Sequence, residues 1–214
     1  MTKRLLITAF ACLLVVAGLT FAAAPKRVTI AAQPSDLARN RQLTLFGTIA
    51  SQREKEIVVL EARDCGQKSF RKVAEVPTVL GGGWSWEFFY PGITATLRAV
   101  WKGNRSLPVT VRDRAFVELR RPQTGDFRVS VRAKTPFGGR RVLFQRLNRG
   151  QAGGWTTVRA VELTETGVPP GVPYVYSSAR FAASVPAGTL VRAVFPRSQA
   201  RPCYLAGYSN LLRT

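Results

Sequence analysis

The chain contains two copies of one short β-rich unit, and this internal repeat limits the available folds more than any other feature. The first copy has residues 58–61, 70–76 and 96–101, and the second has residues 142–145, 155–161 and 190–195 in the same order. The offset grows along the repeat, so the second copy carries extra residues at 164–178. Self-similarity of this kind indicates tandem structural units. We therefore expect one domain at 25–114 and a second at 115–214.

Each copy is a series of short runs rich in Val, Ile, Thr, Phe and Trp, separated by turn residues. In the first copy these runs fall at 27–32, 42–49, 56–63, 69–77, 84–90, 95–102 and 107–112. Several runs alternate apolar and polar residues, as half-buried strands do. About seven short strands in some 90 residues are typical of an immunoglobulin sandwich. The sequence thus predicts an all-β chain with two tandem immunoglobulin-like β-sandwich domains.

A segment with the pattern of a targeting sequence precedes these domains. Lys3 and Arg4 are followed by residues 5–24, which include no charged residue and end in small residues. This pattern predicts a secretory signal peptide at 1–24. An apolar segment of this length can also span a bilayer, which leaves an uncleaved membrane anchor as the alternative. We expect the rest of the protein to be secreted or associated with the cell envelope.

The packing and turn residues of the first copy resemble a known group of domains. The carrying residues are Leu43, Leu45, Gly47, Val58, Leu60, Phe70, Val73, Ala74, Gly83, Trp84, Leu97, Arg98, Ala99 and Ser106. Their order is similar to that in the bacterial Ig-like or fibronectin III-like repeats of secreted actinobacterial proteins. The resemblance implies a sandwich fold and an adhesive, spacer or ligand-binding role. Neither copy has the paired cysteines that bridge the two sheets of antibody domains.

Two cysteines remain outside the predicted signal peptide, Cys65 and Cys203. An exported protein with two cysteines favours one disulfide. Cys65 follows the third predicted strand, and Cys203 lies in a second insertion, between the last two predicted strands of the second copy. Because strands of such a sandwich alternate in direction, both loops should lie at the junction between the domains. We predict a Cys65–Cys203 disulfide there; two unrelated free thiols are the alternative.

The charge is strongly positive, with 32 Lys and Arg against 12 Asp and Glu, for a formal net charge of +20. Such a charge favours anionic partners, and arginine suits bidentate contacts with phosphate or carboxylate. The densest cluster comprises Arg128, Arg132, Arg140, Arg141, Arg146 and Arg149. These residues are the candidate site for an anionic cell-envelope polymer, with no specific nucleic acid expected. The alternative is a set of arginines scattered over a solvated surface.

Two apolar features complete the candidate list. Trp84, Trp86, Phe88 and Tyr90 alternate along one predicted strand and so share one face. We expect this stripe to be core, although exposed aromatic rings can also stack on sugars. The extra residues 164–178 are either a recognition loop, for which another extracellular protein would be the partner, or a packed excursion.

Catalytic chemistry has little support in the sequence. The chain has no histidine, which excludes Ser-His-Asp and Cys-His catalysis and His-liganded zinc. We expect no catalytic residues, metal or cofactor. The prediction is an exported, non-enzymatic Ig-like protein with a binding or structural role. The runner-up is a binder of anionic polymer that works through the basic second domain, and a membrane partner is expected only if the leader is uncleaved.

Overall fold

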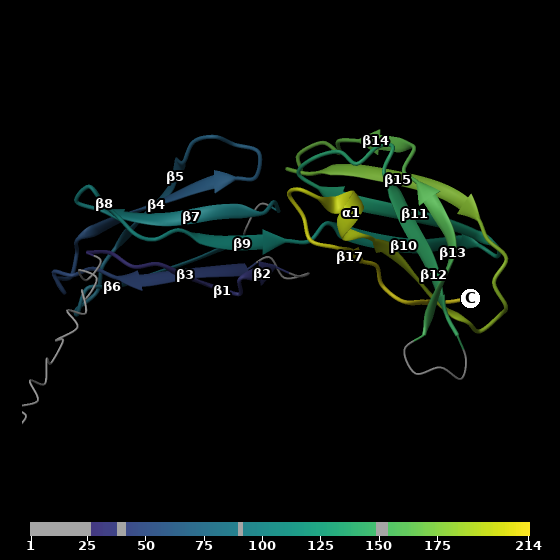
Figure 1. Ribbon diagram of the computed structural model, residues 1–214, viewed down its shortest axis with the longest axis horizontal. Helices are drawn as coiled ribbons and strands as arrows, with labels where there is room; N and C mark the ends of the chain where they lie inside the picture. Colours follow the sequence, from purple (N-terminus) through teal and green to yellow (C-terminus); the bar gives the residue numbers. More distant parts are fainter. Residues whose placement is uncertain (1–26, 38–41, 90–91, 149–153) are drawn as a thin grey trace, which may run out of the picture.

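The computed structural model describes residues 27–37, 42–89, 92–148 and 154–214. The predicted signal peptide, Tyr90 and Arg149 lie outside these residues. The described chain is almost entirely β-structure, and its sole helix there is α1 (Arg197–Ala200). Within these ranges no helix has the length and apolar character needed to cross a membrane. The strands form two sandwiches that lie end to end (Figure 1).

The first sandwich packs a small sheet against a larger one. The small sheet has the order β1-β3-β6, with β1 (Ala31–Gln33), β3 (Gln42–Thr48) and β6 (Gly83–Phe89). The larger sheet has the order β2-β9-β7-β4-β5, with β2 (Asp36–Leu37), β9 (Val109–Asp113), β7 (Ala95–Trp101), β4 (Ile57–Asp64) and β5 (Arg71–Pro77). The short strand β8 (Asn104–Arg105) pairs with β7. All these pairings are antiparallel except that of β2 with β9.

The second sandwich repeats this plan with four strands in one sheet and five in the other. The four-stranded sheet has the order β10-β11-β15-β14, with β10 (Phe116–Gln123), β11 (Asp126–Ala133), β15 (Val175–Ala182) and β14 (Glu165–Gly167). The facing sheet has the order β13-β12-β16-β17, with β13 (Trp155–Glu162), β12 (Arg141–Leu147), β16 (Leu190–Phe195) and β17 (Gly207–Tyr208), and β18 (Leu212–Arg213) also pairs with β16. The fold is therefore that of immunoglobulin-like β-sandwich domains, as the sequence predicts.

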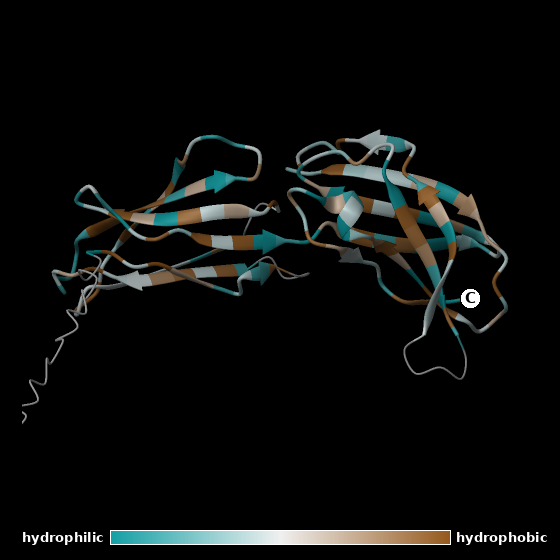
Figure 2. Ribbon diagram, in the orientation of Figure 1, coloured by the Kyte–Doolittle hydropathy of each residue, from teal (hydrophilic) through white to brown (hydrophobic). Residues whose placement is uncertain are grey.

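Alternation along the strands explains how each sandwich obtains its core (Figure 2). In β7 and β11, every second residue is buried, because successive side chains of a strand point to opposite faces. The aromatic stripe of β6 follows the same rule: Trp84 is buried, and Trp86 and Phe88 pack against that core. The described part of the stripe thus has the core role expected from the sequence.

A matched pair of serines shows the repeat at atomic detail. The Ser106 hydroxyl accepts the Ala99 N–H at 2.9 Å, while the Ser106 N–H donates to the Ala99 carbonyl. In the second sandwich Ser209 makes the same two bonds with Ala193, and its hydroxyl accepts at 2.8 Å. Both serines are buried and satisfy a backbone N–H beside the last turn of their sandwich.

Two sequence expectations need correction. The expected strand at 27–32 is wrong in its bounds, because Val28 makes only an isolated bridge with Ile49 and β1 begins at Ala31. Residues 164–178 are also not a simple insertion. They contain β14, and their last four residues already belong to β15, whose pairing with β11 is part of the sheet. The Gly and Pro residues between these two strands suggested an insertion, but they form the turn of a hairpin that extends the sheet.

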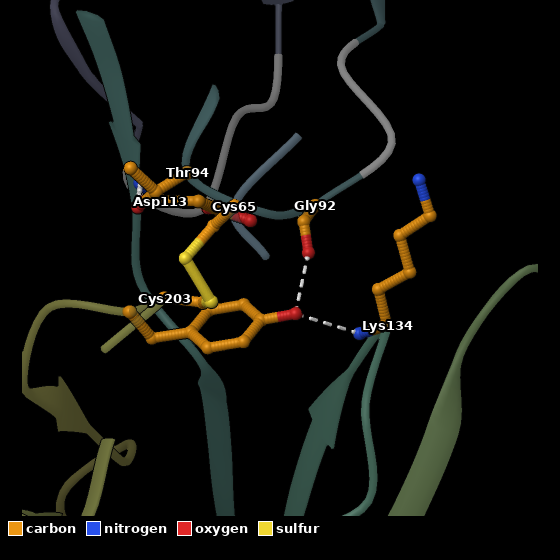
Figure 3. Close-up of a disulfide and its surroundings, with 7 residues drawn as sticks. Cys65, Gly92, Thr94, Asp113, Lys134 and Cys203 are labelled. Atoms are coloured by element: carbon orange, nitrogen blue, oxygen red, sulfur yellow. Dashed lines mark hydrogen bonds between the residues drawn. A yellow bond between two sulfur atoms is a disulfide. The ribbon is translucent and has the colours of Figure 1, made fainter. Parts of the chain in front are cut away.

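The junction between the sandwiches is covalent and apolar at its centre. Cys65 follows β4 and Cys203 lies between β16 and β17, and their sulfur atoms form the predicted disulfide (Figure 3). Ile93, which belongs to the first sandwich, is 4% exposed and packs into the core of the second. Because an apolar side chain of one sandwich is buried in the other, separating them would expose core surface.

Polar contacts surround this apolar centre. The buried Tyr204 hydroxyl donates to the Gly92 carbonyl at 3.0 Å and accepts the Lys134 N–H at 3.0 Å (Figure 3). The Lys134 Nζ also reaches the Asp64 Oδ2 at 2.8 Å. The Leu205 N–H donates to the Asp113 carbonyl at 2.8 Å. The bonds to Gly92, Asp64 and Asp113 join the two sandwiches and fix how the second is oriented on the first.

Candidate functional site

Three arginines stand side by side on the outer face of the β10-β11-β15-β14 sheet. Arg128 of β11 lies directly opposite Arg120 of β10 on one side and Arg180 of β15 on the other. Residues directly opposite in an antiparallel pair have Cβ atoms about 5 Å apart. The residue before each of them, Leu119, Phe127 or Ala179, is buried in the core, so alternation directs all three arginines outward. We call Arg120, Arg128 and Arg180 the arginine row.

Placing three like charges next to each other disfavours the folded sheet. Two carboxylates relieve part of this repulsion. Arg120 forms an ion pair with Glu118 at 2.9 Å, and Arg128 with Glu165 at 3.3 Å. Arg180 is exposed and makes no ion pair within the described residues. The row therefore keeps excess positive charge that a bound anion would neutralise.

The second outward row beyond the arginine row, past Ser130, carries aromatic rings on the same sheet. The Arg132 guanidinium lies 3.8 Å from the centre of the Phe116 ring and 5.7 Å from the rings of Tyr174 and Tyr176. Such contacts fix a cation over ring faces. A hydrogen bond with Tyr174 and partial burial raise the pKa of Tyr176, against the opposing effect of Arg132. Tyr176 is thus a neutral phenol at physiological pH.

A groove of about 540 Å³ lies over this face, between the arginine row and the β14 hairpin. Its walls include Arg120, Arg128, Glu165, Val168 and Tyr176. The Arg128 guanidinium and the Glu165 carboxylate both hydrogen-bond the Ser178 hydroxyl, which connects the row to the hairpin. The groove therefore offers cationic, hydrogen-bonding and apolar surfaces together, as ligand sites do.

The structure distributes the sequence-predicted arginines over both sheets. Arg128 and Arg132 lie on the outer face just described. Arg141 and Arg146 lie on β12 of the facing sheet, and Arg140 uses its Nη1 to hold the Gln199 carbonyl at 2.7 Å. Arg149 is outside the described residues. The described members of the cluster therefore do not gather on a single sheet.

Sequence reasoning missed Arg120 and Arg180. Each follows a buried apolar residue of its strand, Leu119 or Ala179, and this local alternation was the available signal. That they meet Arg128 depends on the register in which β10 and β15 pair with β11, which alternation alone does not reveal.

The side chains of this face are suited to binding anionic groups. Arginine is always charged and presents planar donors that fit carboxylate, sulfate or phosphate. Glu118 and Glu165 serve as ion-pair partners of the row. Within the described ranges, no group of three or more Cys, Asp or Glu residues is placed to hold a metal ion.

Comparisons with known proteins give structural neighbours at low similarity. No protein-family model matches the chain, and no curated protein matches it. A cytokine receptor complex aligns at 14% identity and a TM-score of 0.34, covering 87% of this chain and 94% of that one. The FN1–FN3 domains of chicken CNTN1 align at 14% identity and a TM-score of 0.25, covering 86% and 63% of the two chains.

An enzyme also appears among the neighbours. The purple acid phosphatase PPD1 from yellow lupin aligns at 9% identity and a TM-score of 0.36, and the match covers 87% of this chain and 40% of the phosphatase.

Proposed function

We propose that this protein is an exported, non-enzymatic binding protein whose second sandwich binds an anionic polymer on the arginine row. The observation that carries the proposal is the cross-strand placement of Arg120, Arg128 and Arg180. A sheet gains nothing in stability from three adjacent like charges. A ligand with regularly spaced negative groups gains from all three at once.

The shape of the site favours a polymer over a single small anion. The row crosses three strands of an open sheet face, at steps of about 5 Å. A chain of anionic groups laid across the strands would contact successive arginines. The groove beside the row adds Val168 and Tyr176, which suit the apolar faces of sugar rings. An acidic cell-wall polymer or polysaccharide has both properties.

Export is the part of the proposal that rests on the sequence. Residues 1–24 have the pattern of a signal peptide. The Cys65–Cys203 disulfide supports the same compartment, because such bonds persist mainly in oxidising environments. We therefore place the protein outside the cytoplasm, secreted or associated with the cell envelope.

A second candidate is an extracellular protein partner on the opposite sheet. There the Arg192 guanidinium lies 4.0 Å from the Trp155 ring centre and 5.5 Å from that of Tyr208. Tyr208 is 51% exposed. Trp, Tyr and Arg are the residues that most often dominate the energy of protein interfaces. The role of the arginine row in this case would be only to attract acidic surfaces.

The test measures binding of the exported, oxidised protein to polygalacturonate, heparin and polyphosphate over a salt series. The row variant is Arg120→Glu/Arg180→Glu. The control is Arg197→Glu/Arg201→Glu, which makes the same change in net charge at exposed positions of the second sandwich. We expect the row variant to lose about ten-fold or more in affinity and to lower the salt dependence by about two charges.

The control should lose much less, because its charges lie away from the row. Equal loss in both variants would reduce the interaction to attraction by net charge and would overturn the proposal. Binding to none of the three polymers would direct attention to the Trp155–Arg192–Tyr208 surface.

A further inference from the structure

The end of the first sandwich opposite the junction is built from three turns, at 49–57, 78–83 and 101–107. We call this end the tip. The first two turns are joined by backbone bonds from Ile49 N–H to the Gly82 carbonyl and from Thr78 N–H to the Glu56 carbonyl, each 2.9 Å. The third turn is joined through Glu56, whose Oε2 accepts the Trp101 indole N–H at 2.5 Å. The tip is therefore one connected surface.

Large apolar side chains project from the tip into solvent. Leu80 is 84% exposed, Val79 63%, Leu107 63% and Ile57 49%. Turns are normally formed by Gly, Pro, Asn, Asp and Ser, which expose little apolar surface to water. The 78–83 turn has three glycines, of which Gly81 and Gly82 have positive φ, but it presents Val79 and Leu80 beside them. Exposed apolar groups of this size mark an interaction surface.

Basic residues share the tip with these apolar side chains. The tip and the residue that enters it carry Arg27, Arg53, Lys55, Lys102 and Arg105, against the acidic Glu54 and Glu56. The Lys55 N–H donates to the Thr78 carbonyl at 2.7 Å, so this cation is adjacent to the apolar turn. Apolar residues that share a surface with an excess of Lys and Arg match an anionic lipid surface, where the apolar groups enter the interface and the cations meet headgroups.

The chain order gives a second, independent indication. The Ala50 N–H donates to the Arg27 carbonyl at 2.9 Å, so the described chain begins at the tip. In the sequence, only Pro25 and Lys26 separate Arg27 from the uncharged apolar residues 5–24. Whenever that segment is held in a membrane, two residues of linker keep the tip within reach of the bilayer surface.

We infer that the tip is a lipid-contacting surface, with Val79 and Leu80 in the interface of an anionic bilayer. The inference uses residues of the first sandwich alone and is independent of polymer binding by the second. An anionic bilayer would bury the apolar turn and would also neutralise the basic residues of the tip. The arginine row would then be held away from the membrane, on the far side of the junction.

The test measures fluorescence quenching by brominated acyl chains in vesicles of phosphatidylcholine and phosphatidylglycerol. The full chain is expressed for export, and the protein is purified with whatever N-terminus remains after processing by the cell. The probe variant is Leu80→Trp. The control variant is Leu211→Trp, because Leu211 is also exposed, at 56%, but belongs to the second sandwich. Emission of the wild-type protein is subtracted from both.

Brominated lipid should reduce the emission added by Leu80→Trp about two-fold and leave that added by Leu211→Trp unchanged. Omitting phosphatidylglycerol should weaken the quenching of Leu80→Trp, because the surrounding cations lose their partners. Equal quenching of both variants, or of neither, would overturn the inference. Unchanged thermal unfolding of both variants confirms that the substitutions leave the fold intact.

Discussion

The hydroxyl of Tyr204 is one of the polar groups that join the two sandwiches, and removing it tests the junction without cutting the disulfide. Tyr204→Phe keeps the ring, which packs edge-on against Phe137 at 5.4 Å between ring centres. It removes the donor to the Gly92 carbonyl and the acceptor of the Lys134 N–H. The substitution therefore removes both of these hydrogen bonds and leaves the ring in place.

The expected loss follows from those two bonds. A buried backbone group left without its partner costs about 1–3 kcal/mol. Gly92 is buried, while Lys134 is half-buried and can regain some solvent. We therefore expect Tyr204→Phe to lower the free energy of unfolding by about 2–3 kcal/mol. For a protein of this size that is a fall in Tm of roughly 4–12 °C.

The assay is urea and thermal unfolding of the oxidised protein, followed by circular dichroism. Tyr208→Phe is the matched control, because Tyr208 is 51% exposed and its hydroxyl makes no hydrogen bond within the described chain. Its free energy of unfolding should change by less than about 0.5 kcal/mol. A Tyr204→Phe variant as stable as Tyr208→Phe would refute the bridging role of the hydroxyl.

Three further predictions concern stability. Replacing Cys65 and Cys203 together with serine should lower the free energy of unfolding by up to about 5 kcal/mol, because the disulfide spans a sequence separation of 138 residues; reduced wild-type protein should match this variant in urea. Ser106→Ala should cost about 1–3 kcal/mol in the same assay, because a buried β7 N–H loses its acceptor. Partial burial raises the pKa of Glu56, but hydrogen bonds from Lys102 and the β7 indole outweigh it, so the net pKa is lowered below 4.5. A carboxyl with a lowered folded pKa contributes stability above its unfolded pKa and loses it as the pH falls through the folded one. Glu56→Gln should therefore weaken the acid-side loss of stability below about pH 4.5, measured as Tm against pH.

Local alternation was enough to predict most of the strands of the first sandwich. The expected runs 42–49 and 95–102 correspond to β3 (Gln42–Thr48) and β7 (Ala95–Trp101). Both have an apolar residue at every second position, and a strand half-buried in a sandwich needs little else. The run 27–32 failed because its alternation is not matched by a partner strand over its first residues.

The disulfide could be predicted because it depends only on topology. Alternating strand direction decides at which end of a sandwich each loop lies, and a head-to-tail chain brings two of those ends together. Cys65 and Cys203 needed no knowledge of register to be placed at the same junction. The pairing thus follows from the order of the strands alone.

The arginine row could not be predicted in this way. Its members come from three strands, and Arg180 lies on a strand partly assigned to an insertion in the sequence. A shift of one residue in the pairing of β15 with β11 would direct Arg180 into the core and Phe181 outward. The burial of Phe181 against Phe127 and Phe144 sets that register, and these contacts join residues more than 30 positions apart. Packing of the core therefore creates the charged outer face.

The junction connects the two proposed surfaces mechanically. The tip and the junction lie at opposite ends of β4 and β7, since Ile57 and Trp101 are at the tip while Asp64 and Ala95 approach Cys65. The Ile93 side chain and the disulfide then fix the second sandwich beyond that point. If the tip contacts lipid, the arginine row is presented away from the bilayer at an orientation that the junction determines. A flexible linker would let the same basic face fall back onto anionic headgroups, where lipid would compete with the polymer. In that arrangement the locked junction would prevent this competition, which would give the disulfide between the sandwiches a role in a protein of this charge.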